Sequence, residues 1–170
     1  MFDRPSGAAS DPLAGVLSLV DARCEFSAEF RTGGAWAVRF APPEGGVKFG
    51  VVLRGGCELA VDGLAFRRLE TGDCYLLTRG LPYVLASDLE LPPVAFGVNP
   101  SNDETLQWGR DDDVRIAGGR FVFEGVGASL VLGVPAVLHV PAGTEAAGVL
   151  PWISSGYERS SGRAIRAARG

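Results

Sequence analysis

Much of the chain alternates between hydrophobic and polar residues with a period of two, which predicts short β-strands. The clearest alternations cover residues 23–30, 36–40, 47–53 and 57–61. In the third of these, one face is hydrophobic and the opposite face carries Lys48, Gly50, Val52 and Arg54. Glycine, proline and aspartate between the segments are typical of tight turns. Nine or ten such strands predict an all-β sandwich or barrel.

A few segments depart from this period. After Asp11 and Pro12, which fit an N-cap and a first helical position, hydrophobic residues recur with helical spacing up to Val20. This spacing predicts a short helix over residues 12–20. Residues 1–10 are mostly small and polar, and we expect them to be mobile. Residues 127–135 could form another short helix. Two separate strands are expected around residues 114–116 and 120–123, on either side of Gly118-Gly119.

Composition and charge narrow the class of protein. With 170 residues, 46% of them hydrophobic and 21% charged, the chain should fold as one soluble domain. A net charge of −4, with no basic run in the body of the chain, predicts neither a nucleic-acid nor a membrane partner. We expect a cytoplasmic protein, because no secretory signal or membrane-spanning apolar run is found. Three scattered cysteines are expected as buried core residues; they are Cys24, Cys57 and Cys74.

The segment from Gly72 to Tyr83 carries the strongest motif, a strand entered and left through tight turns. Gly72, Asp73 and Gly80 have the spacing of the second signature of the cupin superfamily, which the segment resembles. That signature reads Gly-Asp, four variable residues, Pro-x-Gly, two more residues and a metal-binding histidine. In this chain Thr78 takes the place of the proline and Tyr83 takes the place of the histidine.

The first cupin signature is matched less well. If Gly55 is its glycine, Lys48 stands at the position of the metal-binding glutamate, and residues 41–44 contain none of the expected histidines. The only histidine of the chain, His139, is expected to be hydrogen-bonded in a late strand. The resemblance thus implies an all-β, cupin-type double-stranded β-helix, or jelly-roll barrel, with minor C-terminal helical segments. We expect it to hold no metal and no other cofactor.

Four further segments, in this order and spacing, are similar to the N-terminal cupin-like domain of AraC-type transcription regulators. They cover residues 48–57, 72–88, 118–123 and 135–141. The likeness extends over residues 11–152 and implies ligand sensing and a homodimer. In that family, helix-turn-helix motifs bind DNA. No such pattern follows here, so no direct DNA binding by the barrel is expected.

The candidate ligand-binding residues follow from the cupin register, which would turn Lys48 and Tyr83 into the interior. There an ammonium and a phenol could orient a small apolar or carbonyl-bearing molecule. Arg39 and His139 are further candidates. Alternatively, Lys48 extends to the rim and Tyr83 only fills the core. No residue is assigned as catalytic, but a metal-independent isomerase or epimerase remains the alternative function, and it would need Lys48, Tyr83 and His139 to converge.

Residues 153–170 form a basic tail that allows two interpretations. On a helix its four arginines would share one face and could contact an acidic partner or nucleic acid phosphate; they are Arg159, Arg163, Arg166 and Arg169. Three glycines in the same segment favour a frayed terminus instead.

Overall fold

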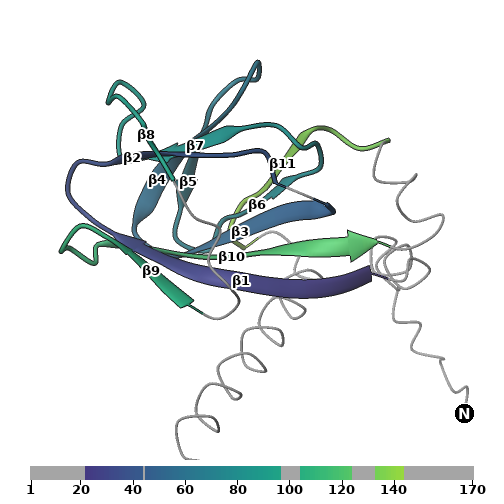
Figure 1. Ribbon diagram of the computed structural model, residues 1–170, viewed down its shortest axis with the longest axis horizontal. Helices are drawn as coiled ribbons and strands as arrows, with labels where there is room; N and C mark the ends of the chain where they lie inside the picture. Colours follow the sequence, from purple (N-terminus) through teal and green to yellow (C-terminus); the bar gives the residue numbers. More distant parts are fainter. Residues whose placement is uncertain (1–21, 44, 97–103, 124–132, 144–170) are drawn as a thin grey trace, which may run out of the picture.

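The computed structural model describes residues 22–43, 45–96, 104–123 and 133–143, and all regular structure in them is β-strand (Figure 1). One sheet contains β1 (Ala22–Thr32), β3 (Val47–Arg54), β6 (Cys74–Leu77), β9 (Glu104–Trp108), β10 (Val114–Phe123) and β11 (Val137–Val140). The other contains β2 (Ala37–Phe40), β4 (Gly56–Val61), β5 (Arg67–Glu70), β7 (Tyr83–Ala86) and β8 (Val94–Ala95). The predicted all-β class is confirmed for these residues.

The two sheets pack face to face. Their strand orders are β11-β6-β3-β10-β1-β9 and β5-β4-β7-β2-β8. Pairing is antiparallel except for β1 with β9 and β2 with β8, which are parallel. The main hydrophobic core lies between the sheets and includes the fully buried Val38, Val52 and Leu59. This arrangement is that of a cupin-like β-sandwich.

Strand β3 shows how the alternation in the sequence becomes two cores. Its odd-numbered residues Val47, Phe49 and Val51 belong to a second cluster on the outer side of the six-stranded sheet. Val52 belongs to the core between the sheets, and Gly50 is covered there by the ring of Tyr75. Because side chains alternate along a strand, Lys48 faces the same interior. The predicted division of faces is therefore confirmed for residues 47–52.

The two glycines of β10 do not separate two strands, and that prediction was wrong. Strand β10 is continuous, with Gly118 and Gly119 paired to β3 on one side and to β1 on the other. A side chain at Gly119 would lie 2.5 Å from the ring of Phe49, so the glycine makes room for that ring. Pairing on both sides thus outweighs the low strand propensity of glycine.

Several sequence predictions lie outside the described residues. These are the mobile residues 1–10, the helix over residues 12–20 and the basic tail 153–170. Of the segment 127–135, only residues 133–135 are described, and they form no helix. In the described part of the chain, no helix is long and apolar enough to cross a membrane.

Two of the three cysteines are buried as predicted, whereas Cys24 is only partly buried and packs against the outer cluster. Cys57 lies in the core between the sheets and Cys74 in the outer cluster, both buried. Burial raises the pKa of each of these two thiols to about 12. They are therefore protonated core residues rather than reactive thiolates.

Candidate ligand site between the sheets

The five-stranded sheet contributes an aromatic wall to the interior. The ring of Phe40 on β2 stacks on Tyr83 of the paired strand β7, with 4.8 Å between centroids and 10° between planes. Phe96 stacks on Phe40 from the other side at 5.3 Å, and Trp108 follows at 6.4 Å from Phe96. Tyr83 is buried, whereas the other three rings are partly buried. This wall is aromatic.

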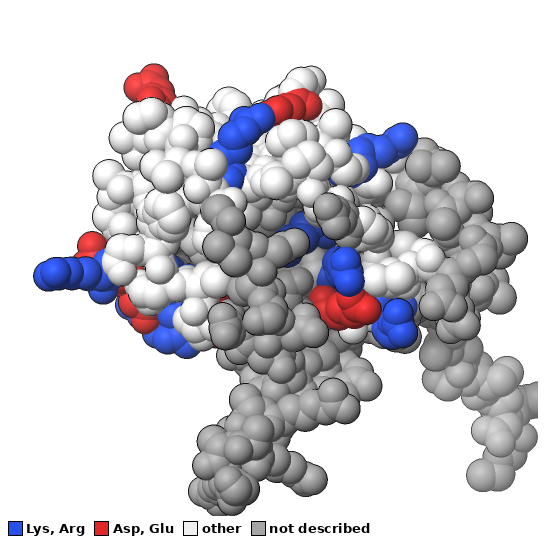
Figure 2. Space-filling model, viewed as in Figure 1, with Lys and Arg blue, Asp and Glu red and all other residues white. Residues whose placement is uncertain are grey.

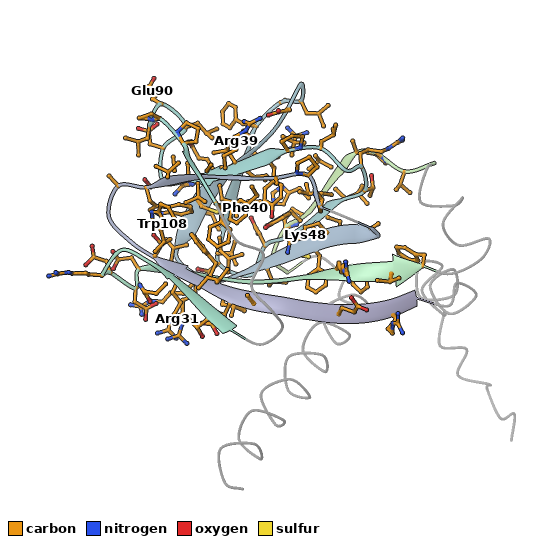
Figure 3. The ribbon with its side chains drawn as sticks, viewed as in Figure 1. Arg31, Arg39, Phe40, Lys48, Glu90 and Trp108 are labelled. Atoms are coloured by element: carbon orange, nitrogen blue, oxygen red, sulfur yellow. The ribbon has the colours of Figure 1, made fainter. Side chains whose placement is uncertain are left out.

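The six-stranded sheet contributes Lys48 and two neighbouring glycines, Gly50 and Gly118. Gly50 on β3 is paired with Gly118 on β10. The ring of Tyr75 fills the space above Gly50, where an added Cβ would lie 2.3 Å from it. Above Gly118 the nearest atom to an added Cβ is the Lys48 Nζ, 3.5 Å away. Figure 3 shows Lys48 and Phe40 in the layer between the two sheets. We call Lys48, Gly118, Phe40, Tyr83 and Phe96 the inner site.

Electrostatics at Lys48 are unusual. Its side chain is half-buried, and no hydrogen bond or ion pair joins its Nζ to any of the residues that the structure describes. Loss of hydration, together with the smaller effect of the positive charge of Arg120, lowers the pKa of this amine to about 8. Arg120 lies opposite Lys48 in the β3–β10 register and bonds through Nε to the Glu25 carboxylate at 2.7 Å. Lys48 is thus an uncompensated ammonium close to losing its proton.

The two tyrosines of the interior are protonated phenols. Burial raises the pKa of Tyr83 above its ordinary value. Burial also raises the pKa of Tyr75, and the proximity of Tyr83 adds to this effect. Neither phenol can act as a base near neutral pH, but the hydroxyl of Tyr83 can donate a hydrogen bond.

Arg39 does not belong to the inner site. It lies on the outer side of β2, because its neighbours Val38 and Phe40 face the core. Its guanidinium forms an ion pair with Asp62, and both side chains are exposed. Figure 3 shows Arg39 pointing away from the space between the sheets.

His139 is also engaged elsewhere. Its Nε2 lies 3.0 Å from the Asp73 Oδ2, and the backbone N–H groups of Glu70 and Ala142 donate to the same carboxylate. Burial alone would raise the pKa of Asp73, but these hydrogen bonds outweigh it and hold the pKa below its ordinary value. His139 therefore holds the edge strand β11 to the start of β6. The structure brings Lys48 and Tyr83 to the interior and gives Arg39 and His139 other partners.

Sequence reasoning missed four members of this region, namely Phe40, Phe96, Arg120 and Gly118. Phe40 shares its strand face with Val38, so its direction was readable from the alternation. The other three are brought in by pairing between distant strands, which leaves no local signal.

Two facing sheets with a hydrophobic core between them define a β-sandwich. The sequence model of the family described as Cupin matches residues 11–158, and the chain belongs to this family. Two curated relatives are both described as AraC-like transcription regulators, as the sequence resemblance predicted. The one from Streptomyces lividans is 44% identical over 146 residues, which are 84% of this chain and 48% of the relative. The one from Streptomyces antibioticus is 43% identical, with the same coverage of both proteins.

The chain thus spans about half the length of the curated relatives it matches. Among solved structures, wild-type ToxT from Vibrio cholerae, bound to an unsaturated fatty acid, is 10% identical with a TM-score of 0.45. That similarity covers 82% of this chain and 48% of ToxT.

The residues present do not fit the metal of the family. Lys48 and Tyr83 occupy signature positions where the family has metal-binding side chains, and an ammonium repels a cation. In the described part of the chain, no three His, Cys, Asp or Glu side chains come together to hold a metal ion. Catalytic metal sites need about three such ligands.

Proposed function

We propose that the chain is a metal-free cupin domain that senses a small, largely apolar molecule and dimerises, as part of transcription regulation in the cytoplasm. The ligand lies in the inner site, against the Phe40 and Tyr83 rings and within reach of the Lys48 amine. This proposal draws on the description of the two Streptomyces relatives, which are about twice as long as this chain.

The observation that carries the proposal is the uncompensated amine of Lys48 in an apolar interior. An enclosed ammonium without a carboxylate costs stability, and an aliphatic side chain at that position would remove this cost. Perturbed ionisable groups of this kind cluster at binding and catalytic sites. The stacked rings opposite Lys48 provide an apolar contact surface with few rotatable bonds, which suits a flat or aliphatic ligand.

The enzyme alternative receives less support. An isomerase or epimerase would need an acid and a base that face each other across the substrate. His139 is held by Asp73 at the edge of the sheet, and burial keeps the phenol of Tyr83 protonated. The remaining wall is aromatic, which favours binding over proton transfer.

A thermal-shift screen of small molecules tests the proposed function. A true ligand should raise the melting temperature of the wild type and of Arg39→Ala by the same amount, because Arg39 lies on the outer face. The rise should be much smaller in Tyr83→Ala, with each variant compared with its own unliganded state. If every hit shifted Tyr83→Ala as much as the wild type, the inner site would not be the ligand site.

Dimerisation is a separate part of the proposal. The segment 12–20 or an exposed edge of either sheet could form the interface. Light scattering coupled to size-exclusion chromatography should give twice the chain mass at micromolar concentration. A single-chain mass that persists with and without ligand would remove dimerisation from the proposal.

A further inference from the structure

Lys48 is the only lysine in the chain, where the other fifteen cationic side chains are all arginine. The two residue types differ chemically, because arginine stays protonated in proteins whereas a desolvated lysine can lose its proton. A site that needed only a positive charge could use arginine, as the rest of this chain does. The single exception is the half-buried amine of the inner site.

The groups around Lys48 favour its neutral form. The guanidinium of Arg120 stands beside it in register, and Arg120 already has the Glu25 carboxylate as its partner. No carboxylate among the described residues pairs with the Nζ of Lys48, and the opposite wall is aromatic. Burial and a neighbouring cation are the two conditions that activate a lysine as a nucleophile.

The size of this activation follows from the shifted pKa. With a pKa of about 8, Lys48 is neutral in roughly a fifth of the molecules at about pH 7.4, against about 0.1% for an ordinary lysine. The reactive fraction is therefore about 200-fold larger than for an exposed lysine. Gly118 brings no side chain over the amine, whose Nζ would lie 3.5 Å from an added Cβ, and the side chain of Lys48 is only half-buried, so the amine stays accessible to a ligand carbon.

We propose that the molecule sensed in the inner site is an apolar aldehyde or ketone, which Lys48 binds reversibly as an imine. This rests on the proposed function, since it names the chemical class of the ligand bound there. The Nζ lone pair attacks the carbonyl carbon, the C–N bond forms and the C=O π electrons move to oxygen. A proton passes from nitrogen to that oxygen, water leaves, and the C=N bond forms without any oxidation or reduction.

An imine fits this site better than a bound anion. The neutral imine removes the uncompensated charge from this half-buried position. Release by hydrolysis returns the free amine, as a reversible sensor requires.

The test is reductive trapping on the full 170-residue chain. The protein is incubated with a series of aldehydes from butanal to 2-naphthaldehyde in the presence of cyanoborohydride and then analysed by intact mass and peptide mapping. Only two amines can react, Lys48 and the α-amino group, whose ordinary pKa is about 8 as well. Because the two amines have similar pKa values, they are neutral to a similar extent at any pH. A preference for Lys48 therefore reports binding of the aldehyde beside it. We expect Lys48 to be labelled by at least one aldehyde at about tenfold lower concentration than the α-amino group.

Control variants and probes separate the outcomes. Lys48→Arg, and Lys48→Met in case the arginine disturbs the fold, should leave only the α-amino adduct. Each aldehyde is compared with its alcohol and its carboxylate by thermal shift. If alcohols bind but no aldehyde labels Lys48 selectively, the imine is refuted and the proposed function stands. If carboxylates bind without aldehyde labelling, Lys48 is an anion site and the imine is again refuted. If no probe binds or labels selectively, both proposals fail.

Discussion

Replacing Lys48 with methionine is expected to stabilise the protein at neutral pH. Methionine keeps the length of the aliphatic stem but brings no charge into the interior. Loss of hydration and Arg120 together lower the pKa of Lys48 from 10.5 to about 8. Each pKa unit corresponds to about 1.4 kcal/mol, so keeping the amine protonated in the folded state costs up to about 3 kcal/mol. Because the side chain is only half-buried, we expect a measured gain of about 1–3 kcal/mol, or about 3–8 °C in melting temperature.

The gain should depend on pH with a defined sign. Between pH 8 and pH 10.5 the unfolded chain still holds the proton on Lys48, whereas the folded protein has released it. The stability of the wild type relative to Lys48→Met therefore rises with pH through this window. The advantage of the variant is complete below pH 8 and disappears as the pH approaches 10.5.

Urea unfolding followed by tryptophan fluorescence, at neutral pH and near pH 10.5, measures this effect. Arg110→Met is the matched control, because it removes one positive charge from an exposed side chain. It should change the free energy of unfolding by less than about 0.5 kcal/mol. If Lys48→Met were no more stable than the wild type at neutral pH, or its gain did not depend on pH, the amine would not be desolvated as argued.

Three further changes test the surroundings. Gly50→Ala should lower the free energy of unfolding by more than about 2 kcal/mol, because the added Cβ would lie 2.3 Å from the Tyr75 ring. Gly118→Ala, whose Cβ would have its nearest neighbour at 3.5 Å, should lower it by less than about 1 kcal/mol. Equal losses in urea unfolding would refute the packing described at these two glycines. Asp73→Asn should lower the free energy of unfolding at neutral pH by about 1–3 kcal/mol. The loss should vanish on acidification, because the pKa of Asp73 is lowered in the folded protein and only the ionised carboxylate is stabilising. An acid unfolding curve identical to that of the wild type would contradict this. In thermal unfolding, Tyr83→Ala should lower the free energy of unfolding by about 3–5 kcal/mol and Tyr83→Phe by much less, because phenylalanine keeps the stacked ring. A similar loss in both variants would mean that the hydroxyl, rather than the ring, stabilises the fold.

The charge pattern of the surface adds little to the account of function. On the face shown in Figure 2, the charged side chains of the described residues form small groups of both signs. Most of the ion pairs among these residues are local, such as Arg23 with Glu25 and Arg68 with Glu70. Exposed pairs of this kind contribute little to stability. The interior, rather than this surface, is where the unusual chemistry lies.

The sequence predicted the fold class and the division of faces in β3 because both depend on a local period of two. The same period placed Arg39 opposite Val38 and Phe40, so its outward direction could have been deduced before the structure. Its inclusion as a candidate ligand residue ignored that alternation. Two separate strands were predicted wrongly around residues 114–116 and 120–123, because a strand that is paired on both sides tolerates glycines that would end an edge strand.

The inner site was only partly predictable. Spacing in the two signatures pointed to Lys48 and Tyr83, and the structure places both between the sheets. Arg120 and Phe96 reach them through pairing of strands far apart in sequence, which no single-sequence pattern contains. The engagement of His139 with Asp73 likewise depends on β11 pairing with β6.

The ionisation of Lys48, the only lysine, can be measured directly. Incorporation of ¹³C-lysine gives a single side-chain Cε resonance, which can be followed by NMR from neutral to strongly alkaline pH without assignment. We expect the Lys48 amine to titrate with a midpoint near 8 in the folded protein and near 10.5 in the unfolded chain. A folded-state midpoint at 10.5 would contradict it, because Lys48 would then be a hydrated surface amine rather than part of a ligand site.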